Sequence, residues 1–121
     1  MSETSKNLPE IKLELGSKPH IRVFRNQVGL AFVGKPPNLT PVRTGLVPGS
    51  ADLIGWTSKV IRQEDVGSKV AVFTSVEVKT ATGRMSDKQD NWKEQVELAG
   101  GIAIKAVTGK EALTKIENWR L

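Results

Sequence analysis

The chain has 121 residues, enough for one domain with a modest core but not for two, so we expect a single domain over residues 1–121. It has no cysteine and one histidine, His20, which excludes a structural zinc site and a thiol nucleophile. Eighteen Lys and Arg against thirteen Asp and Glu give a formal charge of +5, which suits a polyanionic partner and equally suits simple solubility. Without a membrane-length apolar run or signal-peptide features, we expect a cytoplasmic protein that binds no membrane.

The first predicted element is a helix over residues 5–16, with Ser5 as its cap and Pro9 in its first turn. Its apolar residues at helical spacing are Leu8, Ile11 and Leu15. Alternation through Ile11, Leu13 and Leu15 keeps a strand open as an alternative. Residues 20–31 follow as a strand.

Prolines dominate the next segment, residues 34–48. They stand at Pro36, Pro37, Pro41 and Pro48. Since proline lacks a backbone donor and has a fixed φ, they exclude a central strand or a helix interior. Loops of this length are usually functional, and Lys35 and Arg43 make this one a candidate flap over DNA.

Strands are predicted again at residues 51–56 and 70–79, the second being rich in Val and Thr. The polar stretch 57–69 connects them, either as a loop or as a hairpin extension through Val60 and Ile61. Residues 80–84 form a predicted turn around Gly83.

Two helices with clear start signals complete the chain. Ser86-x-x-Gln89 is a capping box that opens a helix, which Gly100-Gly101 ends. Residues 102–107 form a strand, and Thr108-x-x-Glu111 opens the last helix. This order predicts an α/β domain with a mixed central sheet flanked by helices.

The triplet Glu77-Val78-Lys79 carries the predicted chemistry. In a strand, Glu77 and Lys79 share one face while Val76 and Val78 point into the core. A Glu-x-Lys triplet occurs by chance in about one chain in two or three of this length. Glu10-Ile11-Lys12 is such a case: it lies in a predicted helix, where residues two apart do not face each other. The spacing is therefore informative only in a strand.

Asp52, expected on a neighbouring strand, can complete a divalent-metal site with Glu77. Because such a site offers only oxygen ligands, it favours Mg²⁺ or Mn²⁺. Two structural alternatives remain: an Asp that bonds a turn at a strand entry, and a Glu on the open face of an edge strand.

Four sequence blocks follow one another in a specific order. They are Arg25-Asn26-x-Val28-Gly29, Pro48-Gly49-x-x-Asp52-Leu53-Ile54-Gly55, Glu77-Val78-Lys79 and Gln89-x-x-Trp92. Together, over residues 21–107, they resemble the VRR-NUC (virus-type replication-repair nuclease) domain, a branch of the PD-(D/E)xK nuclease superfamily. Small stand-alone members of this family are similar to phage enzymes that cut branched DNA.

This resemblance implies roles for the site residues. Asp52, Glu77 and the backbone carbonyl of Val78 would bind Mg²⁺ (or Mn²⁺), without any organic cofactor. Lys79 would orient the attacking water and offset charge on the phosphate. Gln89 would face the active site, although as the third residue of the capping box it has a structural alternative. Trp92 begins an apolar stripe and is expected in the core.

Basic and polar residues would contact the DNA. The resemblance assigns Arg25 and Asn26 to the phosphate backbone. Weaker candidates, for which a solvated face is an equal explanation, are Arg22, Arg43, Arg84 and Lys88. The family usually adds a glutamate from the first helix, and here Glu3, Glu10 and Glu14 are conceivable without a clear motif.

We therefore expect an Mg²⁺-dependent endonuclease for branched DNA, foremost four-way (Holliday) junctions, acting in DNA repair or recombination. Symmetric cutting of two strands by a small domain with one site needs a two-fold pair, which predicts a homodimer. The family's stand-alone members further suggest a phage-encoded protein acting in a bacterial host. The alternatives are a flap or fork nuclease that cuts one strand, and a non-catalytic DNA-binding module with the same fold.

Overall fold

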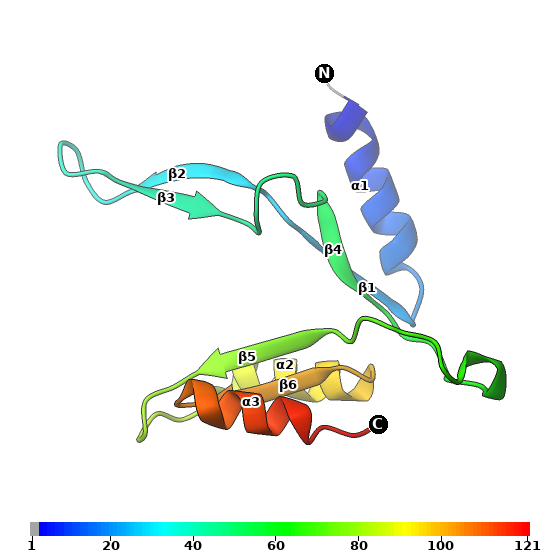
Figure 1. The fold of residues 1–121 in the computed structure, drawn as a ribbon. Helices are drawn as coiled ribbons and strands as arrows, with labels where there is room; N and C mark the ends of the chain where they lie inside the picture. Colours follow the sequence, from blue (N-terminus) through cyan, green and yellow to red (C-terminus); the bar gives the residue numbers. More distant parts are fainter. Residues whose placement is uncertain (1–2) are drawn as a thin grey trace. The chain divides into compact units, whose positions relative to one another are not determined.

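The computed structural model describes residues 3–121, with side chains from residue 7 onward. The chain divides into two compact units, Met1–Thr57 and Ser58–Leu121, and each is described by itself. The described residues contain three α-helices, a short 3₁₀-helix and six strands (Figure 1). The strands form two antiparallel pairs and one parallel pair, and this combination with helices confirms the α/β class. The single domain over residues 1–121 stays a prediction. None of the described helices has the length and apolar character needed to cross a membrane.

The first unit begins with α1 (Glu3–Gly16), which confirms the predicted helix and decides against the strand alternative. The helix starts two residues earlier than predicted, so Pro9 lies inside it rather than in its first turn. Proline at that point removes one helical hydrogen bond. The half-buried Leu8 and Leu15 lie two turns apart on the same face, and α1 packs against β1.

β1 (Ile21–Arg25) pairs antiparallel with β4 (Leu53–Thr57). The rings of Phe24 and Trp56 meet across this pair with centroids 5.7 Å apart, which gives the unit an aromatic contact. β4 confirms the predicted strand at residues 51–56, shifted toward its C-terminal end.

The predicted strand over residues 20–31 is wrong as one element. The chain leaves β4 at Asn26, and β2 (Gly29–Val33) pairs instead with β3 (Thr40–Thr44) in an antiparallel hairpin. β3 lies in the segment that was expected to be irregular. Because this hairpin has only two strands, Pro41 sits on an edge strand, where a missing backbone donor is tolerated. The hairpin is exposed along nearly its whole length.

The second unit is built around β5 (Thr74–Val78) and β6 (Ile102–Ala106), which pair in parallel. Helix α2 (Asp87–Leu98) connects them, and α3 (Gly109–Glu117) follows β6; both helices contact β6 (Figure 1). The predicted strand at residues 70–79 is therefore shorter than expected. In the connection before it, the hairpin extension is absent and a 3₁₀ turn, η1 (Gln63–Asp65), forms instead.

Both helix starts follow the predicted capping signals. Ser86 and Gln89 form a reciprocal capping box at α2, and the hydroxyl of Thr108 accepts from the Glu111 amide at α3. Gly100, with φ +98°, ends α2 in the left-handed region that suits glycine.

The core of the second unit lies where α2 meets β6. Its buried apolar residues are Val96, Ile102, Ala103 and Ala106. Gly101 enters this core with no room for a side chain, since an added Cβ would lie 2.9 Å from Val96 Cγ1 and 3.0 Å from the Phe73 carbonyl oxygen. The close approach of α2 to the sheet therefore depends on glycine at this position.

Candidate active site

One face of β5 points toward α2 and carries two of the predicted catalytic residues, Glu77 and Lys79. Ser75, Glu77 and Lys79 are half-buried, and they alternate with exposed residues along the strand. Gln89 Nε2 donates a hydrogen bond to Glu77 Oε1, and Trp92 Nε1 donates to Ser75 Oγ at 3.1 Å. Two hydrogen bonds, about one helical turn apart, thus connect α2 to this face of β5.

The opposite face of β5 corrects an expectation. Val76 and Val78 were predicted to point into the core, but their exposed fractions are 40% and 75%. Both helices pack on β6, and α2 reaches β5 through hydrogen bonds to Ser75 and Glu77, on the face opposite to the two valines. Glu77 therefore lies on the more enclosed face, which is the reverse of the usual distribution of Glu and Val.

The two oxygens of Glu77 have different surroundings. Gln89 Nε2 donates a hydrogen bond to Oε1, and Lys79 Nζ forms an ion pair with the same oxygen at 3.5 Å. Among the described residues, Oε2 takes part in no hydrogen bond or ion pair. Lys79 is the more buried of the pair, with its side chain 19% exposed. The arrangement fixes one oxygen with two donors and leaves the other available to a ligand.

Gln89 makes the capping-box contact and also contacts Glu77, while its role in an active site stays a prediction. Its Oε1 accepts from the Ser86 amide at 2.9 Å, which is the capping-box contact, while its Nε2 donates to Glu77. An amide side chain has an acceptor at one end and donors at the other, so the two contacts do not conflict.

The backbone carbonyl of Val78 lies at the open edge of β5. The Phe73 carbonyl accepts from Ile102, and the Lys79 amide donates to Ala106, so residues 73 and 79 direct their backbone groups toward β6. Backbone groups alternate in direction along a strand, so the Val78 carbonyl points away from β6. The oxygen is thus outside the β5–β6 hydrogen-bond ladder.

A small cavity of about 40 Å³ adjoins Glu77, Gln89 and Trp92. A water molecule needs roughly 10–15 Å³ of such space, so the cavity has room for a water-sized species. Its walls combine the carboxylate and amide with apolar atoms of Met85 and Ile104.

The donor set fits a hard cation. Glu77 Oε2 and the Val78 carbonyl are both oxygen donors, as Mg²⁺ and Mn²⁺ prefer. Within the part of the chain that the structure describes, no group of three or more His, Cys, Asp and Glu side chains could hold a metal. A cation held by Glu77 and the Val78 carbonyl would therefore need further oxygen ligands, such as water.

Asp52 lies in the first unit, directly before β4. Its side chain is 62% exposed, and Arg25 Nη1 lies 3.4 Å from its Oδ1 and 3.2 Å from its backbone oxygen. The structure therefore brings together Glu77, Lys79 and Gln89 in one unit, and Arg25 and Asp52 in the other. That Asp52 and Glu77 share a cation stays a prediction.

Asn26 has a different environment from the one expected. It is 8% exposed, and its Nδ2 donates to Ser50 Oγ at 2.7 Å and to the Ala51 carbonyl at 2.8 Å. Its Oδ1 accepts from the Leu46 amide at 2.8 Å. Because these bonds use both donors of the amide and an acceptor site, the geometry does not support a contact with DNA. Asn26 instead holds the loop that leads to Asp52.

The remaining candidates are exposed. They are Arg22, Arg43, Arg84, Lys88, Glu10 and Glu14, and the side chain of Glu3 lies outside the described residues. Exposure agrees with a contact to DNA and with a solvated face alike. Ser75, the partner of Trp92, was not predicted, because a serine two residues before a glutamate carries no sequence signal of its own.

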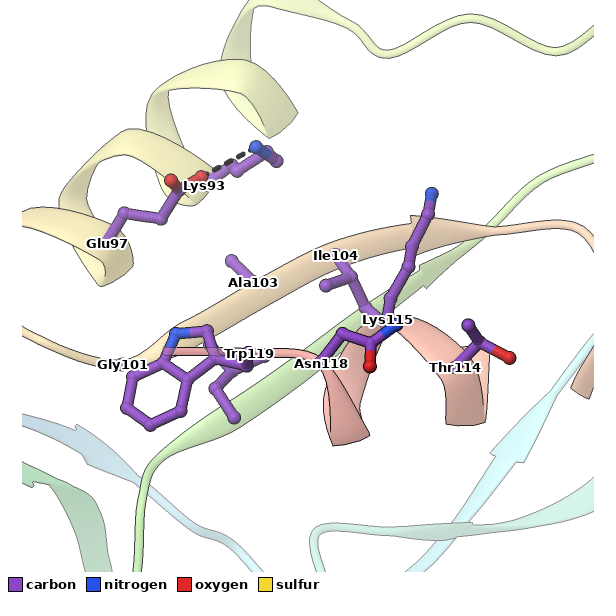
Figure 2. Close-up of a pocket in the computed structure, with 10 residues that line it drawn as sticks. Lys93, Glu97, Gly101, Ala103, Ile104, Thr114, Lys115, Asn118 and Trp119 are labelled. Atoms are coloured by element: carbon purple, nitrogen blue, oxygen red, sulfur yellow. Dashed lines mark hydrogen bonds and ion pairs between the residues drawn. The ribbon is translucent and has the colours of Figure 1, made fainter. Parts of the chain in front are cut away.

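A second depression lies away from Glu77, at β6 between α2 and α3 (Figure 2). Its volume is about 410 Å³, and Lys93 and Glu97 form an ion pair of 2.6 Å on its α2 side. Trp119 and Lys115 line its α3 side, where Lys115 Nζ donates to the Lys105 carbonyl at 2.7 Å. None of the predicted site residues lines it.

Comparison with known proteins identifies one family. A family model described as the VRR-NUC domain matches residues 41–110, which include Asp52, Glu77, Lys79, Gln89 and Trp92. The match begins at β3, so the block at Arg25 and Asn26 lies before it. Neither a curated protein nor a solved structure matches the chain.

Proposed function

The chain belongs to the VRR-NUC family of PD-(D/E)xK-type nuclease domains, and on that premise we propose that it is an Mg²⁺- or Mn²⁺-dependent DNA endonuclease. Its proposed substrate is branched DNA, foremost the four-way junction, in which it hydrolyses phosphodiester bonds by attack of water. The proposed enzyme acts as a homodimer, because symmetric cutting of two strands requires a two-fold pair of sites.

One observation carries this proposal: the carboxylate of Glu77 is held from two directions inside the family-matched segment. Gln89 from α2 and Lys79 from the end of β5 both address Oε1. A glutamate on the covered face of a strand, with a lysine two residues later on the same face, is the arrangement that the family resemblance requires.

The residues divide the proposed chemistry among them. When bound by Asp52, Glu77 and the Val78 carbonyl, the metal ion would activate a water and offset negative charge on the phosphate. Lys79 is half-buried beside Glu77. In the proposed mechanism its ammonium group would offset the charge that develops on the phosphate oxygens. Gln89 fixes the orientation of the Glu77 carboxylate.

DNA binding is supported by charge. The formal charge of +5 and the exposed Arg43, Arg84 and Lys88 provide cations for phosphate contacts. Arg84 and Lys88 lie on either side of the α2 cap, close in sequence to Gln89. Phosphate contacts there would guide the backbone of the DNA toward the Glu77 side of the unit.

The proposal is tested with purified protein and labelled four-way junction, flap and linear duplex, each with Mg²⁺, with Mn²⁺ and with EDTA. We expect metal-dependent cleavage that is fastest on the junction. Glu77→Ala protein should still retard the junction in a gel without cutting it.

Three outcomes would count against it. Cleavage in EDTA would exclude the metal-dependent mechanism, and faster cutting of the flap on one strand would exclude the junction as foremost substrate. Metal-independent binding of the junction without cutting, at all metal concentrations, would indicate a non-catalytic DNA-binding module.

A further inference from the structure

The N-cap of α2 is joined to the Glu77 carboxylate through a single side chain. The Ser86 backbone amide donates to Gln89 Oε1 at 2.9 Å, and the other end of the same amide group, Nε2, donates to Glu77 Oε1. The Ser86 hydroxyl accepts in turn from the Gln89 backbone amide at 3.1 Å. The helix start and the proposed metal ligand therefore belong to one hydrogen-bond chain.

The orientation of the Gln89 amide decides whether this chain exists. If the amide were rotated by half a turn, its carbonyl oxygen would face the Glu77 carboxylate and its NH₂ group would face the Ser86 N–H. Both contacts would then be repulsive. With the Ser86 N–H in place, only one orientation satisfies the two neighbours, and it is the one that donates to Glu77.

We propose that the backbone N–H of Ser86 is a positioning group for the Glu77 carboxylate, acting through Gln89. It holds Gln89 Oε1 so that Nε2 is aimed at Glu77 Oε1, and thereby keeps Glu77 Oε2 available for the cation. This inference rests on the proposed function, in which Glu77 is a metal ligand. It assigns to the cap a role beyond starting the helix.

The consequence is a metal affinity that depends on the cap. Partners that orient a metal ligand typically change metal affinity by about 10- to 100-fold when they are removed. Without the Ser86 N–H, Gln89 can rotate, and Lys79 Nζ, at 3.5 Å from Oε1, becomes the one remaining donor to the carboxylate among the described side chains. The Glu77 carboxylate is then held by Lys79 alone, and its orientation is less fixed.

Ser86 permits a matched pair of variants. Its backbone angles, φ −75° and ψ 165°, lie in the range that proline adopts. Ser86→Ala removes the hydroxyl and keeps the N–H, whereas Ser86→Pro removes both. Since both variants lose the same side-chain cap, the difference between them isolates the N–H.

A third variant, Gln89→Glu, changes the contact between residue 89 and Glu77 instead of the Ser86 N–H. Gln89→Glu can still accept from the Ser86 N–H, because glutamate is a regular residue at this place in a capping box. It cannot donate to Glu77 when ionised. This variant keeps the acceptor for the Ser86 N–H and replaces the donor contact with Glu77 by a repulsion between two carboxylates, so it serves if Ser86→Pro folds poorly.

The measurement is Mn²⁺ binding by calorimetry in the absence of DNA, with thermal denaturation and the Mg²⁺ dependence of junction cleavage beside it. We expect Ser86→Pro to raise the Mn²⁺ dissociation constant by about 10-fold or more over that of Ser86→Ala. Ser86→Ala should bind Mn²⁺ about as tightly as the wild type. Saturating Mg²⁺ should restore most of the cleavage rate of Ser86→Pro, which a general loss of folding would not allow.

Equal Mn²⁺ affinity of Ser86→Pro and Ser86→Ala, with Gln89→Glu also unchanged, would overturn the inference. Failure of the proposed function is a separate result, in which wild-type protein neither binds Mn²⁺ nor cuts DNA. The inference is then decided by the ¹³C resonance of the Glu77 carboxyl carbon. A shift between Ser86→Pro and Ser86→Ala supports positioning by the N–H, and identical resonances contradict it.

Discussion

Asp52 and Glu77, the two carboxylates on which the proposed chemistry depends, are held in different ways. Glu77 has its side chain 37% exposed and is fixed by Gln89 and Lys79, which come from a helix and a strand of the same unit. Asp52 is 62% exposed and meets Arg25, while the buried Asn26 supports the loop before it. One carboxylate is oriented by donors to its own oxygen, the other mainly through its backbone. In a site formed by this pair, the position of Glu77 would depend on side-chain contacts and the position of Asp52 on the geometry of its loop.

The largest effect is expected where both carboxylates are changed. If Asp52 and Glu77 hold one cation, Asp52→Asn and Glu77→Gln should each lower junction cleavage by about 10³-fold. The double variant should lose little more, because residues that act as a unit are not additive. Cleavage rates measure this, with gel retardation of the junction as the control for folding and binding. Independent, multiplying losses would show that the two carboxylates act separately.

The next largest effect distinguishes Lys79, beside Glu77, from Arg25, beside Asp52. Lys79→Met should lower the cleavage rate at saturating DNA by about 10²-fold, because it removes the half-buried charge that in the proposed mechanism offsets charge on the phosphate. Arg25→Met is the matched change at Asp52 and should affect cleavage much less. Single-turnover kinetics measure the cleavage rate of both variants. Equal losses would show that Lys79 and Arg25 contribute alike to cleavage.

Asn26 tests the loop side of the comparison. Asn26→Ala should lower the free energy of unfolding by about 3 kcal/mol, because it removes the three side-chain hydrogen bonds of a buried amide. Gln27→Ala, at the exposed neighbouring position, should change it by less than about 0.5 kcal/mol. Urea unfolding measures both. An Asn26→Ala protein that is as stable as the wild type but binds DNA more weakly would instead support the predicted contact of Asn26 with DNA.

The smallest effect concerns the Arg25–Asp52 ion pair. Since both side chains are substantially exposed, Arg25→Met should change the free energy of unfolding by less than about 1 kcal/mol. Its effect on junction binding should fall as the salt concentration rises, if Arg25 contacts phosphate. Binding titrations at two salt concentrations measure this effect.

Local signals predicted the second unit well. The capping box at Ser86 and the side-chain cap at Thr108 placed the starts of α2 and α3 correctly, because a cap is a contact between residues three apart. The strand at residues 102–107 was also found, since its apolar residues are contiguous. The contact of Gln89 with Glu77 confirms that this glutamine faces the expected carboxylate, while its catalytic role remains a prediction.

Predictions that depended on strand partners fared less well. Pro41 led to the expectation of an irregular segment, but β3 forms because it needs only one partner, β2. The expected strand over residues 20–31 breaks at Asn26, whose side chain turns into the protein to bond the 46–51 loop. The exposure of Val76 and Val78 depends on which strand the helices cover, and hydrophobicity alone does not encode that.

The sequence by itself determined the three helices, the strands near residues 51–56, 70–79 and 102–107, the family blocks and the place of Glu77 and Lys79 on one face, because alternation and capping act over a few residues. Only the tertiary structure decided that Gln89 bridges the cap and the carboxylate, that Asn26 is buried and that Oε1 rather than Oε2 of Glu77 carries the donors. The contact of Gln89 with Glu77 and the bonds of Asn26 join residues 12 to 25 positions apart, and their geometry is set by how a helix or loop packs against a strand.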